Sequence, residues 1–252
     1  AKAELLLAES LATGRLGERK ASALYWRGVA AMRLGHEAEA AGFLAEALTL
    51  GLGLDESREA RLMLAEHDLK NGRTDAAKAA YARLVKEGAC ARMSAARIHA
   101  VGELLGGEAA AICAKALVAE KTPDWRQAGW AMQGRCDEAQ GAYSAAIDAY
   151  RQALAEPAQT ESAASAALAL GRLESRAGEH AAAKATLEKA VTLNAAHPAA
   201  RGAAYLALAE NARAAGDDKA ARGYATVVTT LFADPALVAA AEKILKALPS
   251  EK

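Results

Sequence analysis

The chain has 252 residues, of which 53% are hydrophobic and 25% are charged, a composition typical of a folded protein and not of a disordered one. Alanine contributes 72 residues, whereas 3 Trp, 6 Tyr and 2 Phe are too few for a large β-sandwich or barrel, because strands favour aromatic and β-branched side chains. The 31 basic residues balance 31 acidic ones, without the basic surplus expected of a protein that binds nucleic acid or an anionic membrane. We therefore predict an all-α protein with no nucleic-acid partner.

Helical hairpins follow one another along the chain with a period of 34 to 38 residues. Each hairpin is marked by a glycine in a short loop between two amphipathic stretches. These glycines are Gly35, Gly72, Gly107, Gly141, Gly178 and Gly216. In chain order, the predicted units of a single array over 1–252 are the second helix of a truncated leading repeat (1–20), repeat 1 (21–55), repeat 2 (56–91), a degenerate repeat 3 (92–122), repeat 4 (123–158), repeat 5 (159–198), repeat 6 (199–234) and a capping helix (235–252).

The two ends of this array are predicted to differ. One period before Gly35 falls outside the chain, so residues 1–20 would form half of a hairpin, and we expect the array to begin upstream. At the other end, Pro235 suits the first turn of a helix, and the apolar residues after it recur at helical spacing. A terminal helix of this kind keeps the last apolar face of a repeat array out of water, which explains the predicted capping helix.

Small residues recur at fixed positions around each loop glycine. Seven residues before it stand Gly28, Ala65, Ala100, Gly134, Gly171 and Ala209. Nine residues after it, in the second helix, stand the bulky residues Leu44, Tyr81, Tyr150 and Leu187, each preceded by an alanine one turn earlier. A glycine inside a helix costs about 0.5–1 kcal/mol relative to alanine, so its recurrence at one position indicates close contact between the two helices.

This pattern resembles the tetratricopeptide repeat (TPR) family, and the segment from Gly134 to Leu154, GRCDEAQGAYSAAIDAYRQAL, carries the resemblance most fully. It covers residues 21 to about 234, with an ambiguous register after Gly106 and Gly107 in repeat 3. The resemblance implies a right-handed α-α superhelix in which the first helices line a concave groove. Members of the family bind extended peptides or partner helices in that groove.

The sequence predicts no catalytic, metal or cofactor site. The five histidines lie in different repeats without the spacing that places two metal ligands on one helical face, and the segment 14–20 lacks the second glycine of a phosphate loop. Cys90, Cys113 and Cys136 form no disulfide framework and are interpreted as small buried residues. Uncharged stretches are too short and too mixed to span a bilayer, so no transmembrane segment is expected. We predict that the protein is not an enzyme.

The inner-face positions of the first helices are the candidate binding residues that the resemblance implies. They are Tyr25, Arg33, Arg135, Glu138, Arg172, Arg176 and Arg213. The second half of this set is rich in arginine, whose planar guanidinium suits carboxylates, so we expect a groove for an acidic or C-terminal peptide segment. The alternative is an ordinary solvated helical face.

The leading functional hypothesis is a scaffold that binds a protein or peptide partner of unknown identity. One alternative is a structural self-assembly array, in which the open N-terminal repeat docks on another copy of the chain. An RNA-binding helical repeat is less consistent with the zero net charge. The composition suggests a bacterial protein; its location stays open, with the cell envelope or periplasm preferred to the cytoplasm.

Overall fold

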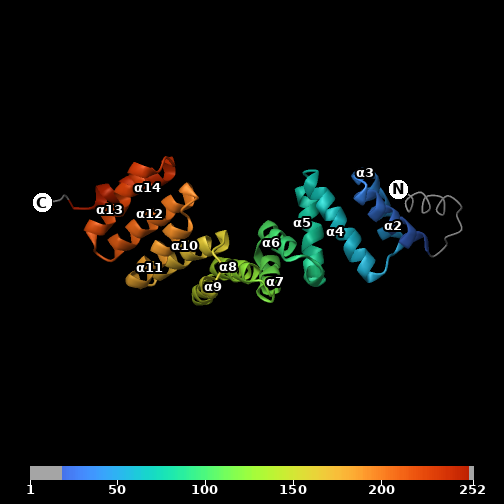
Figure 1. Ribbon diagram of the computed structural model, residues 1–252, viewed down its shortest axis with the longest axis horizontal. Coiled ribbons are helices and arrows are strands. Elements are labelled where there is room, and N and C mark those ends of the chain that lie inside the picture. The colour runs from blue at the N-terminus through green and yellow to red at the C-terminus, as the bar shows by residue number, and fades with distance from the viewer. Residues whose placement is uncertain (1–18, 250–252) are drawn as a thin grey trace. The chain divides into compact units, whose positions relative to one another are not determined.

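The computed structural model describes residues 19–249, and all regular structure within that range is helical (Figure 1). The helices of the N-terminal part are α2 (Lys20–Arg33), α3 (Glu37–Leu50), α4 (Leu54–Lys70), α5 (Thr74–Lys86) and the short 3-10 helix η2 (Ala89–Arg92). The helices of the C-terminal part are α6 (Ala95–Leu105), α7 (Gly107–Val118), α8 (Pro123–Ala139), α9 (Tyr143–Ala155), α10 (Glu161–Arg176), α11 (His180–Leu193), α12 (Pro198–Ala214), α13 (Asp218–Leu231) and α14 (Pro235–Ala247). The protein is an all-α helical-repeat solenoid, as the sequence predicts.

The chain divides into two compact units, the first ending at Met93 and the second beginning at Ser94, whereas the sequence predicts a single array. The first unit holds the hairpins α2–α3 and α4–α5, and the second holds α6–α7, α8–α9, α10–α11 and α12–α13, followed by α14. The predicted truncated leading repeat lies outside the described residues, apart from Arg19 and Lys20.

The hairpins stack so that their first helices form one layer within each unit. In the first unit α2 contacts α4; in the second α6 contacts α8, α8 contacts α10, α10 contacts α12, and α12 contacts α14. The second helices α3, α7, α9, α11 and α13 each pack between their own first helix and the next helix of the layer, as α11 does between α10 and α12. Helix α14 covers the end of this layer and buries Ala241 and Ile244 against α12 and α13, as expected of a capping helix.

Tight turns with a left-handed glycine join the two helices of most hairpins. In the first hairpin Gly35 has φ = 83°, a conformation that side chains with a Cβ rarely adopt. The Gly35 N–H donates to the Met32 carbonyl (3.1 Å) and the His36 N–H to the Ala31 carbonyl (3.0 Å), which satisfies the last carbonyls of α2. Gly72, Gly141, Gly178 and Gly216 repeat this turn with φ between 75° and 81°.

Within the hairpins, interior glycines accept the bulky residue of the second helix, as the spacing predicts. A Cβ on Gly28 would lie 2.7 Å from Leu44 Cγ, and one on Gly171 would lie 2.5 Å from Leu187 Cγ. Carbon atoms do not approach so closely, since their optimal separation is about 3.5–4.0 Å. Leu44 and Leu187 are fully buried, so each glycine is a notch that its partner fills.

The hairpin α6–α7 departs from this pattern, and the predicted register of repeat 3 needs correction. Ala100, the predicted notch residue, is exposed, whereas Gly102 is buried and takes that position. A Cβ on Gly102 would lie 2.6 Å from Met132 Sδ, an atom that belongs to the next hairpin. The cause is the connection between α6 and α7, which consists of Gly106 alone (φ = 65°) and shifts α7 along its partner.

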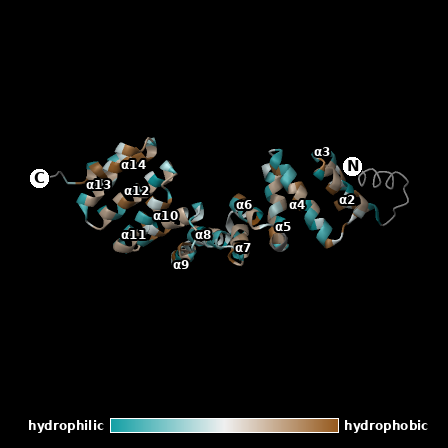
Figure 2. Ribbon diagram, viewed as in Figure 1, coloured by the Kyte–Doolittle hydropathy of each residue, from teal (hydrophilic) through white to brown (hydrophobic). Residues whose placement is uncertain are grey.

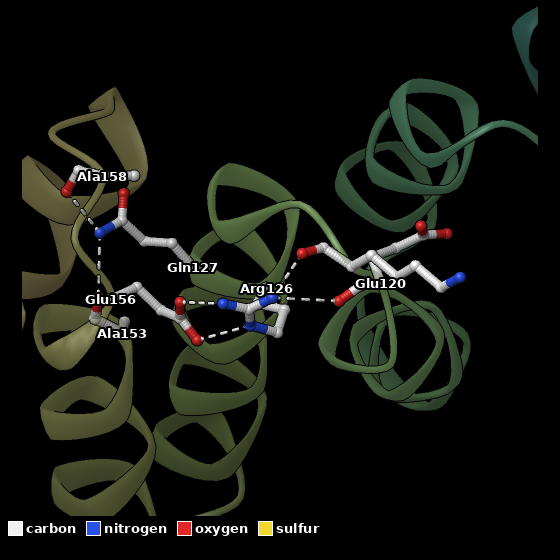
Figure 3. Close-up of polar contacts among 7 residues, drawn as sticks. Glu120, Arg126, Gln127, Ala153, Glu156 and Ala158 are labelled. Atoms are coloured by element: carbon white, nitrogen blue, oxygen red, sulfur yellow. Dashed lines mark hydrogen bonds and ion pairs between the residues drawn. The ribbon is translucent and has the colours of Figure 1, made fainter.

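A buried glutamine joins the end of α9 to the start of α10 (Figure 3). Gln127 of α8 is fully buried, and its amide N–H groups donate to the carbonyls of Ala153 (3.0 Å) and Ala158 (2.9 Å). Its carbonyl accepts a hydrogen bond from the Thr160 hydroxyl (2.6 Å). Every polar atom of the side chain is therefore used, as burial of an amide requires.

A charged clasp lies beside this glutamine. Arg126 of α8 forms a bidentate ion pair with Glu156, with N–O distances of 2.8 and 2.7 Å (Figure 3). The same guanidinium donates to the carbonyl of Lys121 (2.7 Å) after α7. The pKa of the Glu156 carboxyl lies below its ordinary value because this guanidinium hydrogen-bonds to it. The clasp thus links the C-terminal ends of α7 and α9 to the first turn of α8.

Hydrophobic and hydrophilic residues are both present on the helices, as expected of amphipathic helices packed in layers (Figure 2). Cys90, Cys113 and Cys136 are buried, as predicted. Between residues 19 and 249, none of the helices combines the length and the apolar character needed to cross a bilayer.

Candidate functional site

Five of the seven predicted binding residues lie on three neighbouring first helices of the second unit (Figure 1). Arg135 and Glu138 belong to α8, Arg172 and Arg176 to α10, and Arg213 to α12. Because α10 contacts both α8 and α12, these residues belong to one layer. The four arginines are exposed, and we call this set of five residues the arginine row.

The members of the arginine row differ in their partners. Arg135 forms an ion pair with Glu103 of α6, and the Arg176 guanidinium stacks over the Tyr143 ring at 4.8 Å from its centroid. Arg172 and Arg213 have neither an ion pair nor a side-chain hydrogen bond to any residue between 19 and 249. Two exposed positive charges on adjacent helices are thus left for solvent or for a ligand.

Glu138 is engaged inside its own hairpin. Its carboxylate accepts a hydrogen bond from the Tyr150 hydroxyl (3.1 Å), and Tyr150 is buried with its ring against Gly134. Burial, reinforced by the Glu138 charge, raises the pKa of Tyr150 above its ordinary value, so the phenol stays protonated and donates. Glu138 is therefore oriented by the fold and is not a free acidic group of the row.

Tyr25 and Arg33 belong to α2 in the first unit, and the structure corrects the role predicted for Tyr25. Its side chain is 2% exposed, and burial together with a hydrogen bond to Glu59 raises its pKa to about 12. The neighbouring Trp26 is 52% exposed instead. The register of α2 therefore directs Tyr25 into the hairpin core, so it cannot line an open groove, whereas Arg33 at the end of α2 is exposed.

A cavity of about 450 Å³ adjoins Arg135 in the second unit. It opens where the α6–α7 connection meets the last turns of α8. The residues that line it are Gly102, Glu103, Gly106, Gly107, Ala110, Met132, Arg135, Cys136, Ala139 and Gln140. Of these residues the sequence predicts only Arg135 as a binding residue, and the glycine doublet at 106–107 is the sequence signal that marks the cavity.

The first unit has a smaller cavity in the corresponding place, where the α2–α3 turn meets the last turns of α4. Its volume is about 200 Å³, and Met32, Glu37, Met63, Glu66, His67 and Lys70 line it. An exposed ion pair between Lys70 and Glu37 (2.5 Å) crosses its edge and lowers the pKa of Glu37 through a hydrogen bond. Methionine side chains occupy the space that glycines leave open at the α6–α8 cavity.

No cluster of three or more His, Cys, Asp or Glu side chains within the described range could hold a metal ion. Eight of the ten residues that line the larger cavity are uncharged, whereas Glu37, Glu66, His67 and Lys70 make up four of the six that line the smaller one. Such surfaces suit binding.

Comparison with known proteins supports the helical-repeat architecture. The tetratricopeptide repeat family model matches residues 164–197, which cover helices α10 and α11. The C-terminal part of a TPR repeat-containing protein from Cytophaga hutchinsonii superposes with a TM-score of 0.55 at 13% identity, covering 93% of this chain and 94% of that one. A chain of the APC/C hetero-tetramer Cut9–Hcn1 superposes with a TM-score of 0.50 at 17% identity over 98% of this chain.

The chain spans 45% of the length of that second structure. At these identities the likeness concerns the fold alone. None of the curated proteins matches the sequence.

Proposed function

We propose that this chain, a helical-repeat solenoid with one segment that matches the tetratricopeptide repeat model, is a non-catalytic scaffold that binds a protein partner through the arginine row. The segment bound there is an acidic peptide, whose carboxylates pair with the guanidinium groups of α10 and α12. Arginine suits this role because its planar fork can donate two parallel hydrogen bonds to one carboxylate.

The observation that carries the proposal is the pair Arg172 and Arg213. Both are exposed on adjacent first helices, and neither has an ion-pair partner among residues 19–249. Glu210, the other charged residue in the last turns of α12, pairs with neither of them within the same range. Elsewhere on the surface, arginines such as Arg73 and Arg83 are paired with acidic residues of their own hairpin, whereas the exposed lysines Lys184 and Lys219 have no ion-pair partner between residues 19 and 249.

The remaining arginine of α10 supports the same ligand. Arg176 is held over the Tyr143 ring, so its side chain is already ordered on the face of the row. An ordered guanidinium loses less conformational freedom when a carboxylate binds. Arg172, Arg176 and Arg213 would thus present three positive charges to one extended segment.

Selection of peptides from a random 12-residue phage library on the full chain tests this proposal. We expect the selected peptides to be enriched in Asp and Glu. In fluorescence anisotropy, the double variant Arg172→Glu, Arg213→Glu should bind a selected peptide at least about tenfold more weakly, because like charges now face each other.

The matched control is the double variant Lys184→Glu, Lys219→Glu, which makes the same change of charge on exposed positions of the second helices α11 and α13. Its affinity should stay within about threefold of the unmodified protein, since it alters only the long-range field. Equal losses in both variants, or selected peptides without acidic residues, would contradict the proposal.

A further inference from the structure

Two of the four methionines of the chain lie together in the first unit, on neighbouring first helices. Met32 belongs to the last turn of α2 and Met63 to the middle of α4, and these two helices contact each other. Both side chains are half-buried and pack against the same hydrophobic cluster. Both also line the cavity of about 200 Å³ where the α2–α3 turn meets the last turns of α4. Two thioether side chains from different helices therefore border one small space.

An imidazole borders the same cavity. His67 lines it and lies four residues after Met63, so these two side chains share one face of α4. The Asn71 amide nitrogen is nearly equidistant from the two ring nitrogens, 3.3 Å from Nδ1 and 3.5 Å from Nε2, and it donates to the His67 carbonyl (2.7 Å). This amide holds the ring at the end of α4 without a hydrogen bond directed at one nitrogen, which leaves a ring nitrogen for another partner.

The charged residues that line the cavity favour a small cation. Glu37 and Lys70 form an ion pair at 2.5 Å and balance each other, and Glu66 adds a second carboxylate. With a neutral imidazole, the lining therefore carries one net negative charge, which attracts a monovalent cation. The cavity of the second unit differs in this respect, because its lining includes one methionine and no histidine.

We propose that the cavity of the first unit binds one Cu(I) ion through the thioethers of Met32 and Met63 and the imidazole of His67. Soft thioether ligands select Cu(I) and imidazole also suits copper, whereas Mg²⁺ and Ca²⁺ require oxygen ligands. Methionine side chains are flexible, so both sulfurs can close on an ion in so small a space. Because two of the three ligands are thioethers, the site is compatible with the absence of a His, Cys, Asp and Glu cluster from the described range. It lies outside the arginine row and does not depend on the proposed function.

Methyl NMR spectroscopy locates the ion. The full chain is labelled with methyl-13C methionine, which gives one signal for each of the four methionines, and is titrated without oxygen with Cu(I) buffered by bicinchoninate and ascorbate. We expect the signals of Met32 and Met63 to shift together until a single equivalent is bound, while those of Met93 and Met132 stay in place. A shift of Met132 instead would assign the metal to the Cys136 thiol and overturn the proposal, as would the absence of any shift.

Variants of single ligands test the assignment through the affinity. Met63→Leu removes one thioether and nearly conserves the volume of the side chain. Competition with bicinchoninate should show an affinity for Cu(I) at least about tenfold lower, since even residues that only orient metal ligands change metal affinity by about 10–100-fold. His67→Gln should weaken binding by a similar factor. The control is Met93→Leu, the same change at a buried methionine of the first unit that does not line the cavity, and it should keep the affinity of the unmodified protein.

Cysteine thiolates also bind Cu(I), so a further protein separates the two kinds of sulfur. In the triple variant Cys90→Ala, Cys113→Ala, Cys136→Ala, the shifts of the Met32 and Met63 signals and the affinity should be retained. Loss of this response, or equal affinities of Met63→Leu and Met93→Leu, would overturn the proposal. A circular dichroism melt confirms that each variant is folded, and the comparison of Met63→Leu with Met93→Leu decides by itself if the triple variant does not fold.

Discussion

The hairpins α8–α9 and α6–α7 are neighbours in the second unit, yet they close in different ways. In α8–α9 the notch at Gly134 is filled by Tyr150 of the same hairpin, with a Cβ at 134 only 2.6 Å from the tyrosine ring. In α6–α7 the notch at Gly102 is filled mainly by Met132 from the following hairpin, and the small Cys113 of α7 contributes only its Cβ, 3.0 Å from the added Cβ. The notch of α8–α9 is therefore filled by a side chain of the same hairpin, whereas the notch of α6–α7 is filled mainly by a side chain of its neighbour.

The length of the turn explains the difference. A three-residue turn lets the second helix run back with its bulky residue opposite the glycine of the first. The single residue Gly106 shortens the path, so no bulky residue of α7 reaches Gly102, and a cavity stays open below the turn. The shorter turn thus removes the internal plug of this hairpin and leaves a cavity beside it.

The largest effect is expected from removing the internal plug. Tyr150→Ala should lower the free energy of unfolding by about 3–5 kcal/mol, because it leaves a void against Gly134 and removes the hydrogen bond to Glu138. Urea denaturation measures this loss. Tyr143→Ala on the same helix, where the ring is 45% exposed, serves as the control and should cost less than about 1 kcal/mol.

A smaller effect is expected where the short hairpin meets α8. A Cβ on Gly129 would lie 2.7 Å from the Val118 backbone nitrogen and 2.9 Å from the Ala114 carbonyl, and backbone atoms cannot move aside as a side chain can. Gly129→Ala should therefore destabilise the protein by about 1–3 kcal/mol despite its better helix propensity. Gly223→Ala in α13, where nothing lies within 4 Å of the new Cβ, should instead stabilise by about 0.5–1 kcal/mol. Stabilisation by both variants in the same denaturation assay would contradict the close approach of α7 and α8.

The cavity should also be visible in thiol chemistry. Cys136 lines it, whereas Cys113 of α7 is completely buried, so methyl methanethiosulfonate should label Cys136 first. Burial raises the pKa of the Cys136 thiol above its ordinary value, so its labelling rate should keep rising with pH beyond the point at which the rate of an ordinary thiol levels off. Peptide mass mapping over time measures both rates. Equal labelling rates for Cys136 and Cys113 would show that the cavity beside α6–α7 does not admit the reagent.

The smallest effect concerns the clasp at the far end of the regular hairpin. The pKa of Glu156 is lowered in the fold by its hydrogen bonds from Arg126, so the unfolded state binds the proton more readily. The stabilisation is complete above the ordinary carboxyl pKa of about 4.5 and is lost as the pH falls through the lower folded value. Glu156→Gln should therefore lose less thermal stability than the unmodified protein between pH 6 and pH 3. Glu161→Gln, an exposed residue of α10, is the control and should keep the full acid dependence.

Much of this architecture could be predicted from the sequence, because the repeat places small and bulky residues at fixed distances. Gly171 with Leu187 and Gly28 with Leu44 meet as their spacing indicates. The register of α6–α7 could not be predicted in this way, because a shortened turn shifts one helix along the other without changing the character of either. Ala100 and Gly102 are equally acceptable notch residues in the sequence.

The candidate site was predictable only in part. The arginines of α8, α10 and α12 follow from counting along the repeats, and all four are exposed. The burial of Tyr25 depends on which of two adjacent aromatic residues faces the core, which helical spacing alone does not decide. The cavity beside Arg135 depends on contacts between two hairpins and thus appears only in three dimensions.

The most direct measurement of the central claim is a charge exchange between protein and peptide. A selected acidic peptide and its copy with one Asp or Glu changed to Lys are titrated against the unmodified protein and against Arg172→Glu, Arg213→Glu. If the arginines of the row contact the peptide, the protein change alone and the peptide change alone each weaken binding. Combining the two changes should then recover at least about tenfold of the affinity that was lost. Additive losses, with no recovery for any acidic position of the peptide, would show that these arginines do not contact the bound segment.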